Sequence, residues 1–230
     1  MQLSEIKPAY DENLYQQIVS AFPNIDNPDL TPDQKGMIVW SHHNVANSQK
    51  DQKSTGTKEM RLYVIKMARV VILDAQKIKD SVLKSSMVKI VALNKDSLGE
   101  KELALEFIEQ AIILDPDNAD NHSARGIMLN RAGRFEEAKE ELEIAIALAA
   151  GQIIPKDPGR FKHLRFMGNA TRNLAISVKE LGDIRLGITL TYQAEQLWLV
   201  SEEGGWKTET HRQGIAKMRA GWNELLQKKA

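Results

Sequence analysis

Histidines and paired carboxylates are the residues whose spacing could support metal binding or acid–base catalysis. His42 and His43 are adjacent, so on a helix their side chains would point about 100° apart, whereas two ligands on one helical face are about three or four residues apart. The other histidines are isolated in sequence. The pairs Glu136–Glu137 and Glu140–Glu141 flank Lys139 on a predicted helix, where surface solvation explains them. The sequence therefore indicates no metal site and no catalytic carboxylate pair.

Nucleophilic and nucleotide chemistry also lack support. The chain contains no cysteine, which excludes a thiolate nucleophile, a cysteine-ligated zinc and a disulfide framework. It contains neither a G-x-S-x-G elbow nor a glycine-rich phosphate loop after a predicted strand. We therefore expect no catalytic residue, no cofactor and no enzymatic activity.

A cluster of basic and aromatic residues could hold single-stranded nucleic acid, because bases stack on aromatic rings placed between cations. Its members are Lys156, Arg160, Phe161, Lys162, His163, Arg165 and Phe166. The simpler explanation is that the phenylalanines turn inward where a helix begins and leave the charges in solvent. The whole chain balances 31 Lys and Arg against 31 Asp and Glu, whereas proteins that grip a phosphate backbone usually carry a basic excess. The balance disfavours nucleic acid as a partner.

Proline and apolar spacing predict that helices position all of these residues. No proline occurs between Pro32 and Pro116, which permits long helices. Between Thr57 and Leu83, apolar residues recur at the spacing of one helical stripe, and Thr31-Pro32-Asp33-Gln34 predicts a capping box. The expected helices are 11–21, 32–53, 57–81, 84–97, 100–114, 119–131, 135–149, 160–181, 184–200 and 206–227. A break near residues 84–86 and one continuous helix across them both stay open.

The apolar segments also bear on location. No window reaches about 18 apolar residues, so no membrane span is expected. The first residues, MQLSEIKPAY, contain no basic segment followed by an apolar run, so no signal peptide is expected either. These features favour a cytoplasmic protein.

An internal repeat is the strongest pattern in the chain. Glycine and alanine recur 34 residues apart in two successive units and again after a 49-residue step. The recurring sets are Gly99, Ala104 and Ala111; Gly133, Ala138 and Ala145; and Gly182, Gly187 and Ala194. A glycine at the turn reverses the chain between two antiparallel helices, and small residues let the second helix pack closely.

The segments 111–118 (AIILDPDN) and 132–138 (AGRFEEA) add to this pattern. Together they resemble the tetratricopeptide repeat (TPR). The resemblance covers residues 85–201. It implies an all-α, right-handed superhelical stack of antiparallel helix pairs, a TPR-like α-solenoid with divergent amino-terminal helices and a C-terminal capping helix. The expected organisation is an amino-terminal helical module at 1–83 that resembles a divergent helix pair, three TPR-like repeats at 84–201 with an insertion at 151–166, and a capping helix at 202–230.

The resemblance further implies that the first helix of each pair lines a concave groove that binds a peptide or protein segment. By helical geometry, the groove candidates are Lys89, Leu93, Ser123, Ile127, Asn130, Arg131, Arg172, Asn173, Ile176 and Lys179. Arg172 and Asn173 are two adjacent side chains that form strong hydrogen bonds, and we expect them to anchor a partner.

The resulting hypothesis is a non-catalytic protein-interaction module that acts as an adaptor, scaffold or assembly chaperone. Two alternatives stay open. One is a nucleic-acid-binding or regulatory helical protein that uses the basic insertion. The other is a scaffold that assembles from copies of itself as a homo-oligomer.

Overall fold

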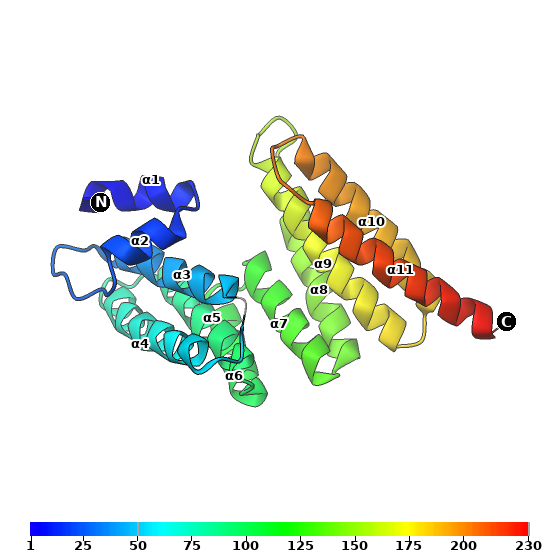
Figure 1. The fold of residues 1–230 in the computed structure, drawn as a ribbon, viewed down its shortest axis with the longest axis horizontal. Coiled ribbons are helices and arrows are strands. Elements are labelled where there is room, and N and C mark those ends of the chain that lie inside the picture. Colours follow the sequence, from blue (N-terminus) through cyan, green and yellow to red (C-terminus); the bar gives the residue numbers. More distant parts are fainter. Residues whose placement is uncertain (50, 230) are drawn as a thin grey trace. The chain divides into compact units, whose positions relative to one another are not determined.

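The computed structural model describes residues 1–49 and 51–229, which form helices joined by short loops, with no β-strand among them (Figure 1). Lys50, inside the predicted amino-terminal module, and Ala230, at the end of the predicted cap, lie outside the described residues. The chain divides into two compact units, Met1–Pro116 and Asp117–Ala230.

The first unit begins with a short 3-10 helix at Leu3–Glu5. Its α-helices are α1 (Ile6–Asp11), α2 (Tyr15–Ala21), α3 (Pro32–Ser48), α4 (Thr55–Lys77), α5 (Ser81–Ser97) and α6 (Lys101–Leu114). From α1 to α6, each helix packs against its successor (Figure 1). One core cluster, which includes the fully buried Ile38, Val64 and Met87, joins α3, α4 and α5.

The second unit is built in the same way. Its helices are α7 (Ala119–Ala132), α8 (Phe135–Gly151), α9 (Arg160–Glu180), α10 (Ile184–Glu202) and α11 (Glu209–Lys229). Each again packs against the next in the chain (Figure 1). The apolar stripe of α11 contributes Ile215, which packs against Ala194 and Trp198 of α10. The same stripe contributes Trp222, which packs against α9 and the start of α10.

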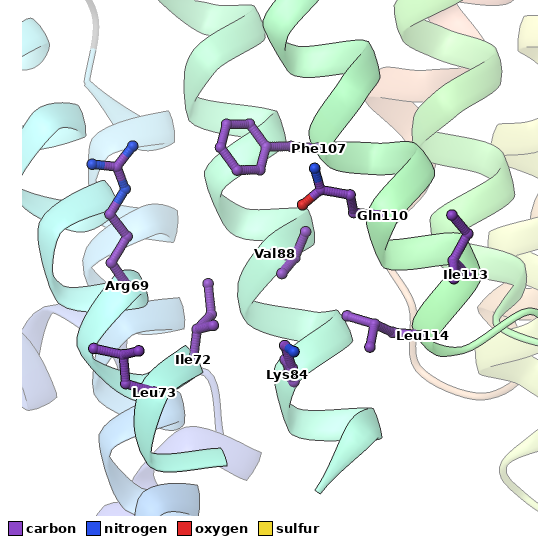
Figure 2. Close-up of a pocket in the computed structure, with 9 residues that line it drawn as sticks. All are labelled: Arg69, Ile72, Leu73, Lys84, Val88, Phe107, Gln110, Ile113 and Leu114. Atoms are coloured by element: carbon purple, nitrogen blue, oxygen red, sulfur yellow. The ribbon is translucent and has the colours of Figure 1, made fainter. Parts of the chain in front are cut away.

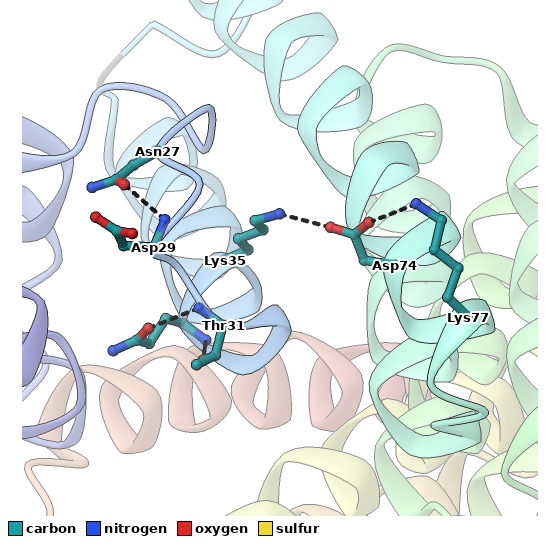
Figure 3. A network of polar contacts seen from close by, with 7 residues as sticks. Asn27, Asp29, Thr31, Lys35, Asp74 and Lys77 are labelled. Atoms are coloured by element: carbon teal, nitrogen blue, oxygen red, sulfur yellow. Dashed lines mark hydrogen bonds and ion pairs between the residues drawn. The ribbon is translucent and has the colours of Figure 1, made fainter.

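The capping chemistry at the start of α3 is confirmed. The Gln34 backbone N–H donates to the Thr31 hydroxyl at 3.3 Å, and the Thr31 N–H donates to the Gln34 side chain at 2.9 Å (Figure 3). One turn further on, Lys35 reaches Asp74 of α4 at 2.7 Å (Figure 3). This hydrogen bond from Lys35, supported by the charge of Lys77, holds the pKa of Asp74 below its usual range.

The predicted helix 32–53 is too long, because α3 ends at Ser48 and Gln49 is extended. The Gln52 amide donates to the carbonyl oxygens of Ala46 and Asn47, so Gln52 folds back over the end of α3. The next helix then starts at its own cap, where Ser54 accepts from the Thr57 N–H at 3.2 Å. The short helix α1 is also absent from the predicted set.

The break between α4 and α5 lies earlier in the chain than residues 84–86. Lys79 adopts a left-handed conformation with φ of 58°, and the Asp80 side chain accepts from the Leu83 N–H at 2.8 Å, which starts α5 at Ser81. The predicted boundary between residues 83 and 84 therefore lies inside α5. The assignment of residues 84–201 to three repeats stays a prediction.

The repeat glycines have the conformation that a helix reversal needs. Gly99, Gly133 and Gly182 all lie between two consecutive helices, with φ of 86°, 78° and 103°. In this left-handed region only glycine avoids a steric penalty. The sequence interpretation of these three residues as turn positions is confirmed.

Candidate functional site

The predicted groove residues lie on the first helix of each predicted pair, in two different units. Lys89 and Leu93 are on α5 of the first unit. The second unit contains the others, which are Ser123, Ile127, Asn130 and Arg131 on α7 and Arg172, Asn173, Ile176 and Lys179 on α9.

In the second unit, hydrogen bonds bring the predicted residues of α7 and α9 together. The Asn130 amide donates to the backbone carbonyl of Asn173 at 3.0 Å, and the Ser177 hydroxyl donates to the Asn130 side-chain oxygen at 2.8 Å. We call the surface formed by Asn130, Arg172, Asn173 and Ile176 the α7–α9 face. Because side chains interlock its two helices, this face is held in one arrangement.

Arg172 is the cation of the α7–α9 face. It is half-buried and forms no ion pair with any described residue. Burial is the main cause that lowers the pKa of His211, and the charges of Arg165 and Arg172 lower it further. Lys179, by contrast, is paired with Glu180 at 2.7 Å, and Ile176 packs partly against the Trp222 cluster.

In the first unit, Lys89 faces a buried polar network that sequence reasoning did not find. Its ammonium nitrogen lies 5.3 Å from the centroid of the Trp40 ring, and that ring packs edge-on against His43. The Asn94 amide lies 3.0 Å from His43 Nδ1, and Arg61 donates to the Asn94 side-chain oxygen at 3.2 Å. His43 is therefore a structural histidine that connects α3 to α5.

Burial is the main cause that lowers the pKa of His43 to about 4, and the nearby charges of Arg61 and Lys89 act in the same direction, against the hydrogen bond of Asn94. The imidazole is consequently neutral near pH 7. No carboxylate contacts it in the described structure, so it lacks the acidic partner of a general base.

A second polar cluster explains two departures from the repeat pattern. His122 and Arg125 of α7 stand where the repeat usually has large apolar residues, and both contact Glu141 of α8, at 2.8 Å and 2.5 Å. Burial by itself raises the pKa of Glu141, but the His122 hydrogen bond and the Arg125 charge outweigh it, so the net pKa is lowered. The cluster therefore ties α7 to α8 through charged side chains at these two positions.

A groove between α4 and α6, floored by α5, was also missed by sequence reasoning. Its volume is about 570 Å³, and Figure 2 shows α4 and α6 as its two walls. We call it the α4–α6 groove. It is lined by Arg69, Ile72 and Leu73 of α4, Lys84 and Val88 of α5, and Phe107, Gln110, Ile113 and Leu114 of α6.

A comparable groove of about 620 Å³ lies between α8 and α10 over α9 in the second unit. Five of its lining residues stand 83 residues after five of the first groove, which is the sum of the 34- and 49-residue repeat steps. The pairs are Lys84 and Met167, Val88 and Thr171, Gln110 and Gln193, Ile113 and Gln196, and Leu114 and Leu197. Both grooves therefore follow from the repeat architecture, and the repeat alignment is the signal that could have located them.

The basic insertion is partly occupied by the chain itself. Arg160 donates to the Pro155 carbonyl at 2.7 Å and lies over the Phe161 ring, at 4.3 Å from its centroid. Arg165 lies over the Trp206 ring at 4.1 Å. One face of each ring is thus covered, which reduces the surface on which bases could stack.

The described residues contain neither a metal-binding cluster nor a membrane-spanning helix. No group of three or more His, Cys, Asp or Glu side chains is placed to hold a metal ion. None of the described helices is long and apolar enough to cross a membrane.

The consecutive helix pairs and glycine reversals define a TPR-type fold. The solved structures that resemble this chain include MamA AMB-1, with 14% identity, coverage of 85% of this chain and 94% of that one, and a TM-score of 0.51. They also include a putative kinesin light chain of Podosopora anserina with nearly identical TPR-like repeats, with 14% identity, coverage of 86% and 98%, and a TM-score of 0.51. At a sequence identity this low, the similarity to these structures shows the fold alone. No protein-family model matches the chain, and no curated protein matches it in sequence.

Proposed function

We propose that this protein is a non-catalytic interaction module that binds a peptide or protein segment on its α7–α9 face and acts as an adaptor, scaffold or assembly chaperone. The observation that carries the proposal is the interlock of Asn130 with Asn173 and Ser177 beside Arg172. A face held in one arrangement loses less conformational freedom when a partner binds.

The chemistry of the α7–α9 face suits a peptide. Arg172 forms no ion pair with a described residue, and its guanidinium can hold a carboxylate with two hydrogen bonds. The side chain of Asn173 can bond a peptide backbone, and Ile176 adds partly exposed apolar surface. Leu93, Ile127, Arg131 and Lys179 remain proposed contributors on their own helices. Lys89 and Ser123 also remain proposed contributors, although both are buried in the free protein.

The test is a comparative pull-down with the intact protein and the double variant Arg172→Ala/Asn173→Ala. Lysates of the source cells are used with and without nuclease treatment, and the captured proteins are quantified by mass spectrometry. The matched control is Arg185→Ala/Asn223→Ala, which changes the same residue types at exposed positions on α10 and α11. We expect specific proteins to be lost from the first variant and kept by the control, with circular dichroism unchanged in both.

Three results would contradict the proposal. Equal capture by both variants would remove the α7–α9 face from the site. Capture that disappears with nuclease and falls steeply with salt would favour the basic insertion. Recovery of this chain alone, with concentration-dependent light scattering, would favour self-assembly.

A further inference from the structure

We propose that the α4–α6 groove is a second docking surface, which binds an amphipathic α-helix of a partner protein with a carboxylate beside its apolar stripe. The residues of this groove are all in the first unit. The inference is thus independent of the α7–α9 face.

Exposed apolar side chains are the first reason to regard the α4–α6 groove as a docking surface. Ile113 of α6 is 74% exposed and Leu73 of α4 is 59% exposed, and both belong to the lining shown in Figure 2. Between the two walls lies the buried Val88 of α5. Covering these side chains removes apolar surface from water, so the groove favours an apolar occupant.

The polar groups of the groove indicate that the occupant is a helix. An extended peptide brings unpaired backbone N–H and C=O groups, which must find partners when they are buried. Gln110 is the only uncharged polar side chain among the nine lining residues. A helix satisfies its own backbone groups and needs no such partners.

The length of the groove sets the size of the occupant. On α6 the lining runs from Phe107 to Leu114, which corresponds to about 10 Å of helix axis at about 1.5 Å per residue. On α4 the lining residues Arg69, Ile72 and Leu73 have the spacing of one helical face. The groove therefore accommodates about two turns, with apolar side chains at positions i, i+3 or i+4, and i+7.

The charged residues of the α4–α6 groove indicate that its occupant is acidic. Arg69 and Lys84 are the only charged residues of the lining, and neither forms an ion pair within the described part of the chain. They come from different helices, α4 and α5 (Figure 2). In the α8–α10 groove, Met167 stands at the position of Lys84 and Gln196 at that of Ile113, so the preference for an acidic helix belongs to the α4–α6 groove.

The test uses two synthetic helical peptides and the full-length protein. Both peptides carry leucines at i, i+3, i+4 and i+7, flanked by glutamates in one and by lysines in the other. Fluorescence anisotropy should show binding of the acidic peptide, with the lysine peptide about tenfold weaker or more. Ile113→Ser should weaken the acidic peptide about tenfold or more, and Arg69→Glu/Lys84→Glu should reverse the preference between the peptides.

Leu62→Ser is the matched control, because Leu62 is 52% exposed on α4 and lies outside the groove lining. It should leave peptide binding unchanged. Absence of acidic-peptide binding, equal binding of the two peptides, or equal loss in the Ile113 and Leu62 variants would each overturn the proposal. So would a dimer of the free protein that Ile113→Ser dissociates without any peptide binding, since the occupant would then be a second copy.

One further measurement keeps this inference distinct from the proposed function. The Arg172→Ala/Asn173→Ala variant should bind the acidic peptide as the wild type does. A loss of binding in that variant would overturn the assignment of the peptide to the α4–α6 groove.

Discussion

At the residue scale, one buried imidazole couples the stability of the first unit to pH. His43 of α3 contacts Asn94 of α5, which in turn accepts from Arg61 of α4. These three residues are far apart in the sequence.

We expect the free energy of unfolding to fall as the pH drops from 6.5 towards 4. In the unfolded chain the His43 imidazole binds a proton at its ordinary pKa of 6.5, whereas burial keeps the folded one neutral down to about 4. The unfolded state therefore gains protons first as the pH falls. The contribution of His43 across this window is about 3 kcal/mol.

Urea unfolding of the wild type and of His43→Gln between pH 4 and pH 7 checks this expectation. The variant should show a smaller slope of stability against pH, whatever its stability at pH 7. Part of the slope should remain, because burial also lowers the pKa of His42 and of His211. Identical slopes in the two proteins would contradict the assignment.

At the element scale, glycines inside helices decide how closely neighbouring helices approach. A Cβ atom on Gly168 of α9 would lie 2.5 Å from the indole nitrogen of Trp198 on α10. That indole is fully buried and donates to Asn169 at 3.1 Å. A Cβ on Gly214 of α11 would meet no atom within 4 Å.

We therefore expect opposite effects from two chemically identical substitutions. Gly168→Ala should lower the free energy of unfolding by about 1–3 kcal/mol, because the buried ring has to move. Gly214→Ala should raise it by about 0.5–1 kcal/mol, because alanine favours a helix over glycine. Chemical denaturation followed by circular dichroism measures both, and a neutral Gly168→Ala would show that α9 and α10 can separate without cost.

The glycines at the turns between helices allow a second test at the element scale. Gly133 has a left-handed backbone with φ of 78°, and a Cβ there would meet no atom within 4 Å. The cost of Gly133→Ala should therefore come from the backbone alone, about 1–2 kcal/mol. Gly133→Asn should cost less, because asparagine tolerates this conformation. Equal losses in the two variants, measured by thermal denaturation, would contradict a conformational origin.

At the scale of the whole molecule, each compact unit contains a core made of its own residues. The cluster around Ile38, Val64 and Met87 lies within the first unit. The clusters around Leu142, Trp198 and Trp222 lie within the second. An independent core is what a chain segment needs in order to fold by itself.

We expect the fragments 1–116 and 117–230 each to give a helical circular dichroism spectrum and a cooperative thermal transition. A fragment that is expressed as a soluble chain but melts without cooperativity would show that its core needs the other unit. The acidic peptide offers a second readout, because fragment 1–116 contains the whole α4–α6 groove.

The sequence by itself determined the features that depend on neighbours along the chain. The capping box at Thr31, the turn glycines Gly99, Gly133 and Gly182, and most helix bounds follow from local backbone chemistry. The TPR-type fold followed from the repeat spacing, because equivalent small residues mark equivalent packing positions. Two predicted helix bounds were wrong, the end of the helix at Ser48 and the start of the helix after Asp80. At both places a side chain caps the helix end, and such contacts do not appear in the helical periodicity of the sequence.

Only the tertiary structure decided which distant residues meet. Nothing in the spacing of His43, Arg61 and Asn94 indicates their contact, because each lies on a different helix and the contact depends on how α3, α4 and α5 pack. The α4–α6 groove has the same origin. Ile113 belongs to an ordinary apolar helix in sequence, and its 74% exposure follows from the gap that α5 leaves between α4 and α6. Local chemistry fixes the helices, whereas their packing fixes which apolar and charged side chains remain available to a partner.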